Sequence, residues 1–178
     1  MRLQDYDSDG VERFKVIAQK YCSVIDSRHA LEKTEFLLQI YRILPELISK
    51  GIQLPPVQLA DDEGEEKEAS IREARAKRRM KHEEWSELYN SLKEKLGNWD
   101  LYWQLFDPTT DNEPIHGSLA DDIADIYRDL KDGIDLSESN EVPPSEIIFD
   151  WRLGFFSHWG KHAIDALRTS HFLLEGTL

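Results

Sequence analysis

The chain has 178 residues and a mass of 20.8 kDa, which suits one domain that buries a core without disulfides. Hydrophobic residues make up 40% of it and charged residues 32%, a globular composition that excludes a disordered chain and a membrane-embedded one. The formal net charge of −13 argues against a general binder of nucleic acid, because phosphate contacts need a surplus of Lys and Arg. We therefore expect a single domain over residues 1–178, with neither nucleic acid nor membrane among its partners.

The acidic excess is concentrated in the C-terminal part of the chain. Residues 99–178 carry 5 basic and 16 acidic side chains, a net charge of −11, whereas residues 1–60 are neutral overall. Any functional use of the acidic charge should therefore be sought after residue 98.

The first residues, MRLQDYDSDG, lack the basic and apolar regions of a secretory signal, and we expect a cytoplasmic protein. The longest apolar stretch, residues 36–48, contains polar side chains and is too short to cross a membrane. Cys22 is the only cysteine, so an internal disulfide and a cysteine-rich metal site are excluded. Its place on an apolar helical stripe predicts a small buried thiol.

Apolar side chains at helical spacing predict two N-terminal helices, over residues 11–25 and 31–49. Pro45 lies inside the second pattern and predicts a kink or an early end of that helix. Gly51 is expected to end the helix in any case.

Residues 58–82 differ in composition, with an acidic run followed by a basic run and almost nothing to bury. We interpret them as a flexible acidic loop that leads into a solvated helical stem. The basic run could suggest nucleic acid, but the adjoining acidic run would screen it. A further helical stripe covers residues 85–96, and Gly97 closes it.

The segment 99–106 is ambiguous, because its aromatic and aliphatic residues fit both a strand and a helical turn. No second strand candidate stands out, so we expect no real sheet and a loop over 107–117. Trp99 and Trp103 in this segment have two interpretations. They belong to the core, or, if exposed, they anchor a protein partner.

Ser118 is a good N-cap for a helix over residues 118–135. On a helical wheel Asp122 flanks the apolar stripe of this helix, whereas a set of other aspartates lies opposite the stripe and is expected to face solvent. The expected solvent-facing aspartates are Asp121, Asp125, Asp129 and Asp132.

The last helix is expected over residues 143–172 and is apolar on two sides, which is typical of a helix at the centre of a bundle. The predicted fold is therefore all-α, a bundle of about five helices with one long charged connection and a central C-terminal helix.

The last helix places His158, His162 and Asp165 on one inward-looking face. One interpretation is a polar network in which the histidines bond to aspartates of the neighbouring helix. A second is a divalent metal site made of His158, His162, Asp165 and Asp122. A third is general acid–base chemistry without a metal. The spacing differs from the zinc-protease motif, because Trp159 stands where that motif has Glu.

Two runs of sequence carry a resemblance to a known family. The run GSLADDIADIYRDLK over 117–131 and the run HWGKHAIDALR over 158–168 are similar to a bacterial family described as a domain of unknown function. The likeness covers most of the chain except the charged stretch near 60–82. It implies a bacterial, soluble, helical protein and implies no activity. It also marks a set of motif residues, namely Asp121, Asp122, Asp125, Arg128 and Asp129.

The leading functional hypothesis is a non-catalytic protein-interaction module with a protein partner or a second copy of itself, and it requires no cofactor. Its interaction surface would comprise Asp121, Asp125, Asp129, Trp99 and Trp103. The alternative is a metal-dependent hydrolase that holds a divalent metal at His158, His162, Asp165 and Asp122.

Overall fold

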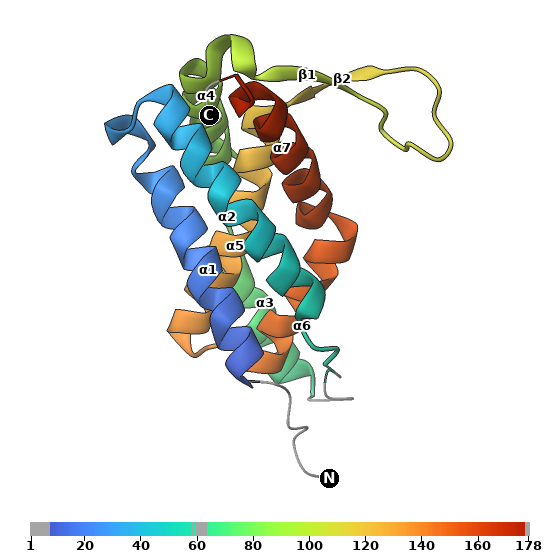
Figure 1. Cartoon of the computed structure of the whole chain (residues 1–178). Helices are drawn as coiled ribbons and strands as arrows, with labels where there is room; N and C mark the ends of the chain where they lie inside the picture. The colour runs from blue at the N-terminus through green and yellow to red at the C-terminus, as the bar shows by residue number, and fades with distance from the viewer. Residues whose placement is uncertain (1–7, 58, 60–63, 177–178) are drawn as a thin grey trace.

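The computed structural model describes residues 8–57, 59 and 64–176. These residues form a helical bundle with one small hairpin, so the predicted all-α class is confirmed (Figure 1). The helices are α1 (Ser8–Asp26), α2 (Lys33–Gln53), α3 (Glu65–Arg78), α4 (His82–Leu96), α5 (Leu119–Ser139), α6 (Pro144–Ser157) and α7 (Trp159–Leu174). Short 3-10 turns cover Arg28–Ala30 and Gly97–Trp99, and the strands are β1 (Leu101–Gln104) and β2 (Ile115–Ser118). No described helix is both long and apolar enough to pass through a bilayer.

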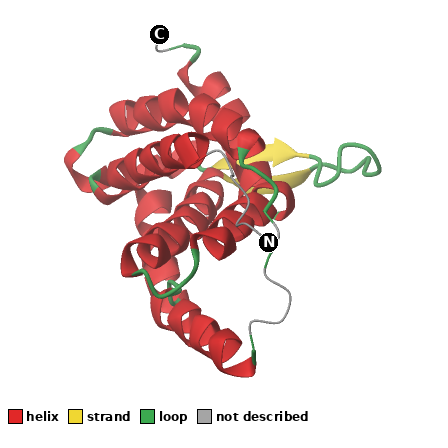
Figure 2. Ribbon diagram, turned by 90° about the horizontal axis from the view of Figure 1, so that it is seen from below, coloured by secondary structure: helices red, strands yellow, loops and turns green. Residues whose placement is uncertain are grey.

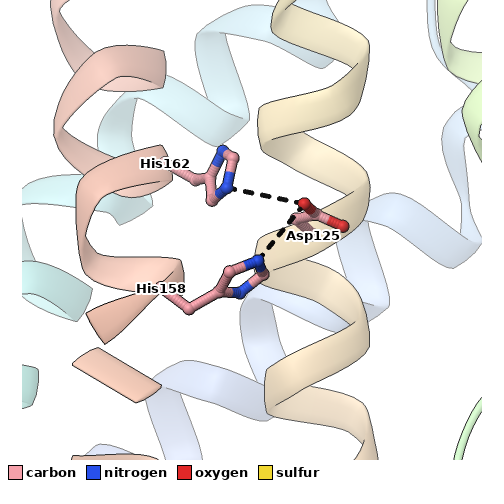
Figure 3. A group of neighbouring side chains, drawn as sticks. All are labelled: Asp125, His158 and His162. Atoms are coloured by element: carbon pink, nitrogen blue, oxygen red, sulfur yellow. Dashed lines mark ion pairs between the residues drawn. The ribbon is translucent and has the colours of Figure 1, made fainter. Parts of the chain in front are cut away.

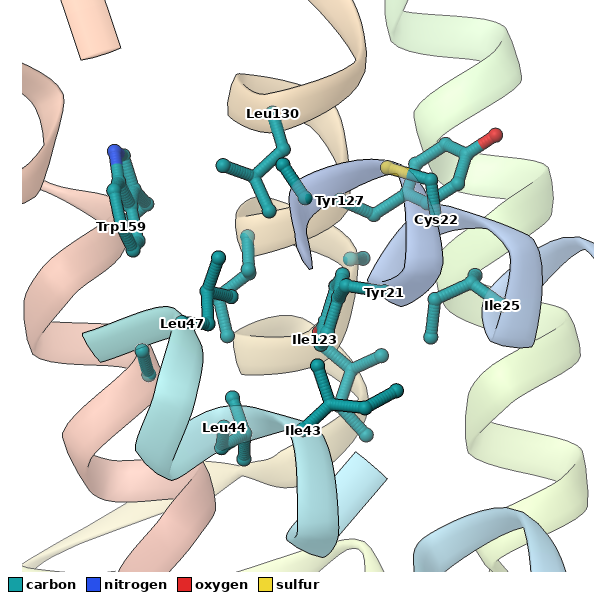
Figure 4. Packing of buried hydrophobic residues seen from close by; sticks show 14 of the residues in the cluster. Tyr21, Cys22, Ile25, Ile43, Leu44, Leu47, Ile123, Tyr127, Leu130 and Trp159 are labelled. Carbon is teal, nitrogen blue, oxygen red and sulfur yellow. The ribbon is translucent and has the colours of Figure 1, made fainter. Parts of the chain in front are cut away.

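Helix α5 is the centre of the bundle, because it packs against α1, α3, α4, α6 and α7. Its apolar stripe meets those of α1, α2 and α7 in a core that includes Tyr21, Leu47, Ile123 and Trp159 (Figure 4). Cys22 lies in the same core, as predicted, and burial raises the pKa of its thiol to about 12. The C-terminal helical segment is not buried on two sides as expected, since Phe156 of α6 and Ile164 of α7 are exposed.

The last helical segment is two helices and not one, which corrects the prediction for residues 143–172. Helix α6 ends at Ser157, and His158 has the non-helical angles φ −148° and ψ −87° before α7 begins. A tight turn needs little side-chain bulk here, and a Cβ on Gly160 would lie 2.0 Å from the Phe155 carbonyl oxygen. The break places His158 at the junction of α6 and α7.

Helix α2 passes through Pro45 and Gly51 and ends at Gln53, so the expected early end is wrong. Gly51 does not end the helix, and its lack of a side chain matters for the packing of α2 against its neighbours. A Cβ at this position would lie 2.6 Å from the ring of Phe155 and 2.7 Å from that of Trp159. The glycine therefore lets α2 approach the junction of α6 and α7 closely.

The chain has a two-stranded antiparallel hairpin where the sequence predicted no sheet. Strand β1 pairs with β2 in the register Leu101 to Ser118 and Gln104 to Ile115. The hairpin projects beyond the helices as an arm (Figures 1 and 2). Strand β2 has only four residues, too few for its alternation to stand out in the sequence.

The helical stem predicted within 58–82 is α3, and it is less solvated than expected. Ile71 and Ala74 are buried, and Arg75 lies 2.8 Å from carboxylate oxygens of both Glu146 and Asp150 on α6. The acidic loop predicted before the stem lies largely outside the described residues.

Candidate functional site

The start of α5 is fixed by two side chains that cap its free amides. The Ser118 hydroxyl accepts a hydrogen bond from the Asp121 amide at 3.2 Å, as the sequence predicted. The Asp100 carboxylate, which precedes β1, accepts a second one from the Ala120 amide at 2.9 Å. This fixed start sets which residues of α5 face α7, and these include Asp122, Asp125 and Asp129.

The two histidines of the 158–162 motif each contact an aspartate of α5. His158 Nδ1 lies 2.7 Å from Asp129 Oδ2, and His162 Nδ1 lies 2.8 Å from Asp122 Oδ1. The predicted polar network between the histidines and the neighbouring helix is therefore confirmed. Each contact holds the imidazole ring by its Nδ1 atom, so the Nε2 atom of each histidine is turned elsewhere.

Both Nε2 atoms face one oxygen of Asp125 (Figure 3). The separation from Asp125 Oδ2 is 3.5 Å for His158 Nε2 and 3.4 Å for His162 Nε2. The other oxygen of Asp125 is already engaged, because it accepts the Trp85 indole N–H at 2.9 Å and lies 3.0 Å from Arg128. A single carboxylate oxygen and two imidazole nitrogens therefore converge on one small volume between α5 and α7.

Residues outside the predicted set complete the surroundings of the cluster. Tyr102 of β1 donates its hydroxyl to Asp122 Oδ2 at 2.6 Å, and Trp85 of α4 supports Asp125. Neither residue stands near the histidine motif in the sequence, and no local pattern pairs them with it. Only the packing of α4 and the hairpin against α5 brings them there.

Burial and hydrogen bonding shift several pKa values at the site. Burial raises the pKa of Asp122, although its bonds to His162 and Tyr102 act in the opposite direction. Burial alone would lower the pKa of His162, but the hydrogen bond and charge of Asp122 outweigh it and raise the pKa. The phenol pKa of Tyr102 is raised by burial and by Asp122. The imidazole of His162 thus carries a proton more readily than a free histidine.

Among the described residues, two groups of side chains bring three possible metal ligands within 4.8 Å of one another. One is Asp125, His158 and His162, and the other is Asp121, Asp122 and His162. Both oxygens of Asp122 already hold hydrogen bonds, which favours the first group. Asp165 of the predicted metal quartet belongs to neither group and lines a groove with Phe106 and Lys161 instead.

The aspartates predicted to face solvent do not form an exposed surface. Asp125 is only 8% exposed, and Asp121 and Asp129 are partly buried. The wheel prediction is wrong here because α4 and α7 cover the side of α5 opposite its apolar stripe.

The two tryptophans of the predicted interaction surface differ in exposure. Trp99 is half-buried and lies under the ammonium group of Lys33, whereas Trp103 is 63% exposed on the arm.

Comparisons with known proteins show similarity of sequence and fold. A family model described as a domain of unknown function, DUF5063, matches residues 6–175. The crystal structure of protein BF1032 from Bacteroides fragilis is similar over 93% of this chain and 92% of that one, with a TM-score of 0.73 and 23% sequence identity. At that identity the likeness shows the fold alone. No curated protein matches the chain.

Proposed function

The chain belongs to the DUF5063 family, whose description assigns no activity, and on that premise we propose from the geometry that it binds one divalent metal ion. The ligands would be His158 Nε2, His162 Nε2 and Asp125 Oδ2. Asp122 and Asp129 would hold the two rings by their Nδ1 atoms.

The observation that supports the proposal is the distance of Asp125 Oδ2 from each of the two Nε2 atoms. Two ligand atoms that each lie about 2.1 Å from a tetrahedral ion are about 3.4 Å apart. The distances from Asp125 Oδ2 to the two Nε2 atoms are 3.4 and 3.5 Å. These distances are long for hydrogen bonds but fit the edges of a metal coordination shell.

The hydrogen bonds behind the ligands support the same proposal. Metal-bound histidines nearly always donate their second ring N–H to a carboxylate, carbonyl or water, which fixes the tautomer and the ring orientation. Here Asp129 and Asp122 occupy that position for His158 and His162 at 2.7 and 2.8 Å. The polar network is therefore compatible with a metal without any rearrangement of the Nδ1 contacts.

Two imidazoles and one carboxylate suit Zn²⁺ or another transition metal better than Ca²⁺ or Mg²⁺, which prefer all-oxygen ligands. Three protein ligands leave a coordination position open for water or a bound molecule. Catalytic zinc sites have such an open position, whereas structural zinc sites do not. A metal-dependent hydrolase is the activity that this ligand set would serve, with a metal-activated water as nucleophile.

Metal analysis of the purified protein after loading with Zn²⁺ tests the proposal. We expect one equivalent of zinc in the wild type, and its loss in a double variant with His158→Ala and His162→Ala. His171→Ala on the same helix is the matched control and should retain the metal. Circular dichroism establishes that the double variant keeps its helices. Failure of the folded wild type to retain zinc, or retention by the folded double variant, would refute the site.

A second candidate function is the protein-interaction module of the sequence analysis, located on the arm and not on the aspartates. Trp103 and Phe106 are 63% and 62% exposed there. Exposed aromatic side chains of this size are typical anchors of protein–protein contacts. Either a partner protein or a second copy of the chain fits this surface.

A further inference from the structure

A groove made of two adjoining hollows lies along α5 and α6, next to His158 of the proposed metal site. One part of it, about 330 Å³ in volume, is bordered by His158, Arg79 and Arg128. An adjoining part of about 380 Å³ is bordered by Arg75, Arg79 and Trp151. The two parts share four lining residues, which are Arg79, Asp129, Asp132 and Asp150.

The acidic side chains of the groove are already engaged with donors of the protein. Asp150 lies 2.8 Å from Arg75 Nη2, and Asp132 accepts the Met80 amide at 2.9 Å. Asp129 holds His158 at 2.7 Å. These carboxylates therefore have less capacity left for the donors of a bound molecule.

Some donors of the groove are paired with carboxylates, namely Arg75 Nη2 and the guanidinium of Arg128, whereas three others have no partner. The guanidinium of Arg79 makes no hydrogen bond or ion pair with the described residues, although it lies in the field of Asp132. Arg75 Nε and Trp151 Nε1 are buried and have no hydrogen-bond partner in the described part of the chain. Unpaired buried donors are rare and costly, so an acceptor at this position would stabilise the protein.

The charge of the groove does not oppose an anionic ligand. Three arginines and three aspartates line the groove, so its formal charge is balanced in a chain whose net charge is −13. The three donors without partners come from α3, the residue after α3, and α6. Because these three donors come from different elements, they suit a ligand with several acceptor oxygens better than a ligand with a single carbonyl oxygen.

We infer that this groove binds a small molecule through an oxyanion, a phosphate or carboxylate group, placed between Arg79 and the metal site. The inference rests on the proposed function in that the metal ion would lie at the His158 end of the groove. The Arg79 guanidinium provides charge-assisted hydrogen bonds to the oxyanion. Arg75 and Trp151, whose Nε and Nε1 donors are buried without partners, are among the residues that line the 380 Å³ part of the groove.

Titration with inorganic phosphate, followed by the indole N–H signals in NMR spectra, tests the inference. The protein is titrated both zinc-loaded and metal-free, with sodium acetate as a second probe and sodium chloride as the control. We expect saturable shifts of the Trp151 signal and little change at Trp103, which lies on the arm and lines neither part of the groove. Acetate binding more tightly than phosphate would assign the groove to carboxylates.

Arg79→Gln and Arg72→Gln are the matched variants, since Arg72 lies on α3 with its side chain 71% exposed and outside the groove. We expect Arg79→Gln to weaken phosphate binding about tenfold and Arg72→Gln to leave it unchanged, with equal zinc content in both. Absence of binding by both anions, or equal effects of the two variants, would overturn the inference while the metal site stands. Absence of zinc from every sample would refute the proposed function, and the metal-free titrations would still decide whether the groove binds anions.

Discussion

His162 and Asp122 are joined by a contact of 2.8 Å between Nδ1 and Oδ1 that links α7 to α5. The other oxygen of Asp122 accepts the Tyr102 hydroxyl at 2.6 Å, so the arm, the central helix and the last helix meet at one carboxylate. This carboxylate fixes which nitrogen of His162 is turned towards Asp125. The proposed metal affinity therefore depends on a residue that does not itself bind the ion.

Asp122→Asn is expected to lower zinc affinity 10- to 100-fold, because the amide cannot orient and polarise the imidazole as a carboxylate does. Tyr102→Phe is the matched control, since it removes the contact with Oδ2 and leaves the contact between Oδ1 and His162. We expect a loss smaller than that of Asp122→Asn in the control. Competition with a chromogenic chelator measures both affinities. Wild-type affinity in Asp122→Asn would show that this contact has no part in metal binding.

Asp132 is expected to make the protein less stable as the pH rises from about 4 to 7. Burial raises its pKa from 3.8 to about 6, against the hydrogen bond from the Met80 amide. A carboxyl whose pKa is raised by folding favours the folded state while it is protonated, and that contribution disappears as the pH passes the folded-state value. Since the group is partly exposed, we expect a contribution of about 1–2 kcal/mol.

Chemical unfolding of the wild type and of Asp132→Asn at a series of pH values measures this effect. Asparagine keeps an acceptor for the Met80 amide but does not ionise, so the difference between the two proteins isolates the carboxyl group. The free energy of unfolding of the wild type should fall relative to that of the variant between pH 4 and 7. A difference that stays constant over this range would contradict the assignment.

Helical periodicity led to the histidine–aspartate network as one of three interpretations, although the chain breaks at His158 between α6 and α7. It placed His158 and His162 on an inward face, and both contact aspartates of α5. The same method failed for Asp125, because a wheel built on one helix cannot tell that α4 and α7 cover its polar side. Tyr102 and Trp85 reach the site only through tertiary packing, so no local pattern could have indicated them.

Gly160→Ala is expected to destabilise the protein and to disturb the metal site. The new Cβ would lie 2.0 Å from the Phe155 carbonyl oxygen, a backbone atom that cannot rotate away as a side chain can. Forced overpacking of this kind costs about 1–3 kcal/mol, and relief of the clash would shift the junction that carries His158. Gly176→Ala, whose Cβ would meet no atom within 4 Å, is the control. Thermal unfolding and zinc content are the measurements. A Gly160→Ala variant as stable as the control would show that the turn can accommodate a Cβ at this position.

The exposed aromatics of the arm should affect association and not stability. Trp103→Ser and Phe106→Ser remove side chains that are 63% and 62% exposed, so we expect the free energy of unfolding to change by about 0.5 kcal/mol or less. If the arm binds a second copy of the chain, sedimentation should show concentration-dependent dimers of the wild type that both variants lose. Val16→Ser, at a residue 55% exposed on α1, is the control for loss of an apolar surface side chain and should dimerise like the wild type. A wild type that stays monomeric would exclude a second copy of the chain as the partner and leave a different protein. Dimers that persist in both variants would place the contact between the two copies elsewhere on the molecule.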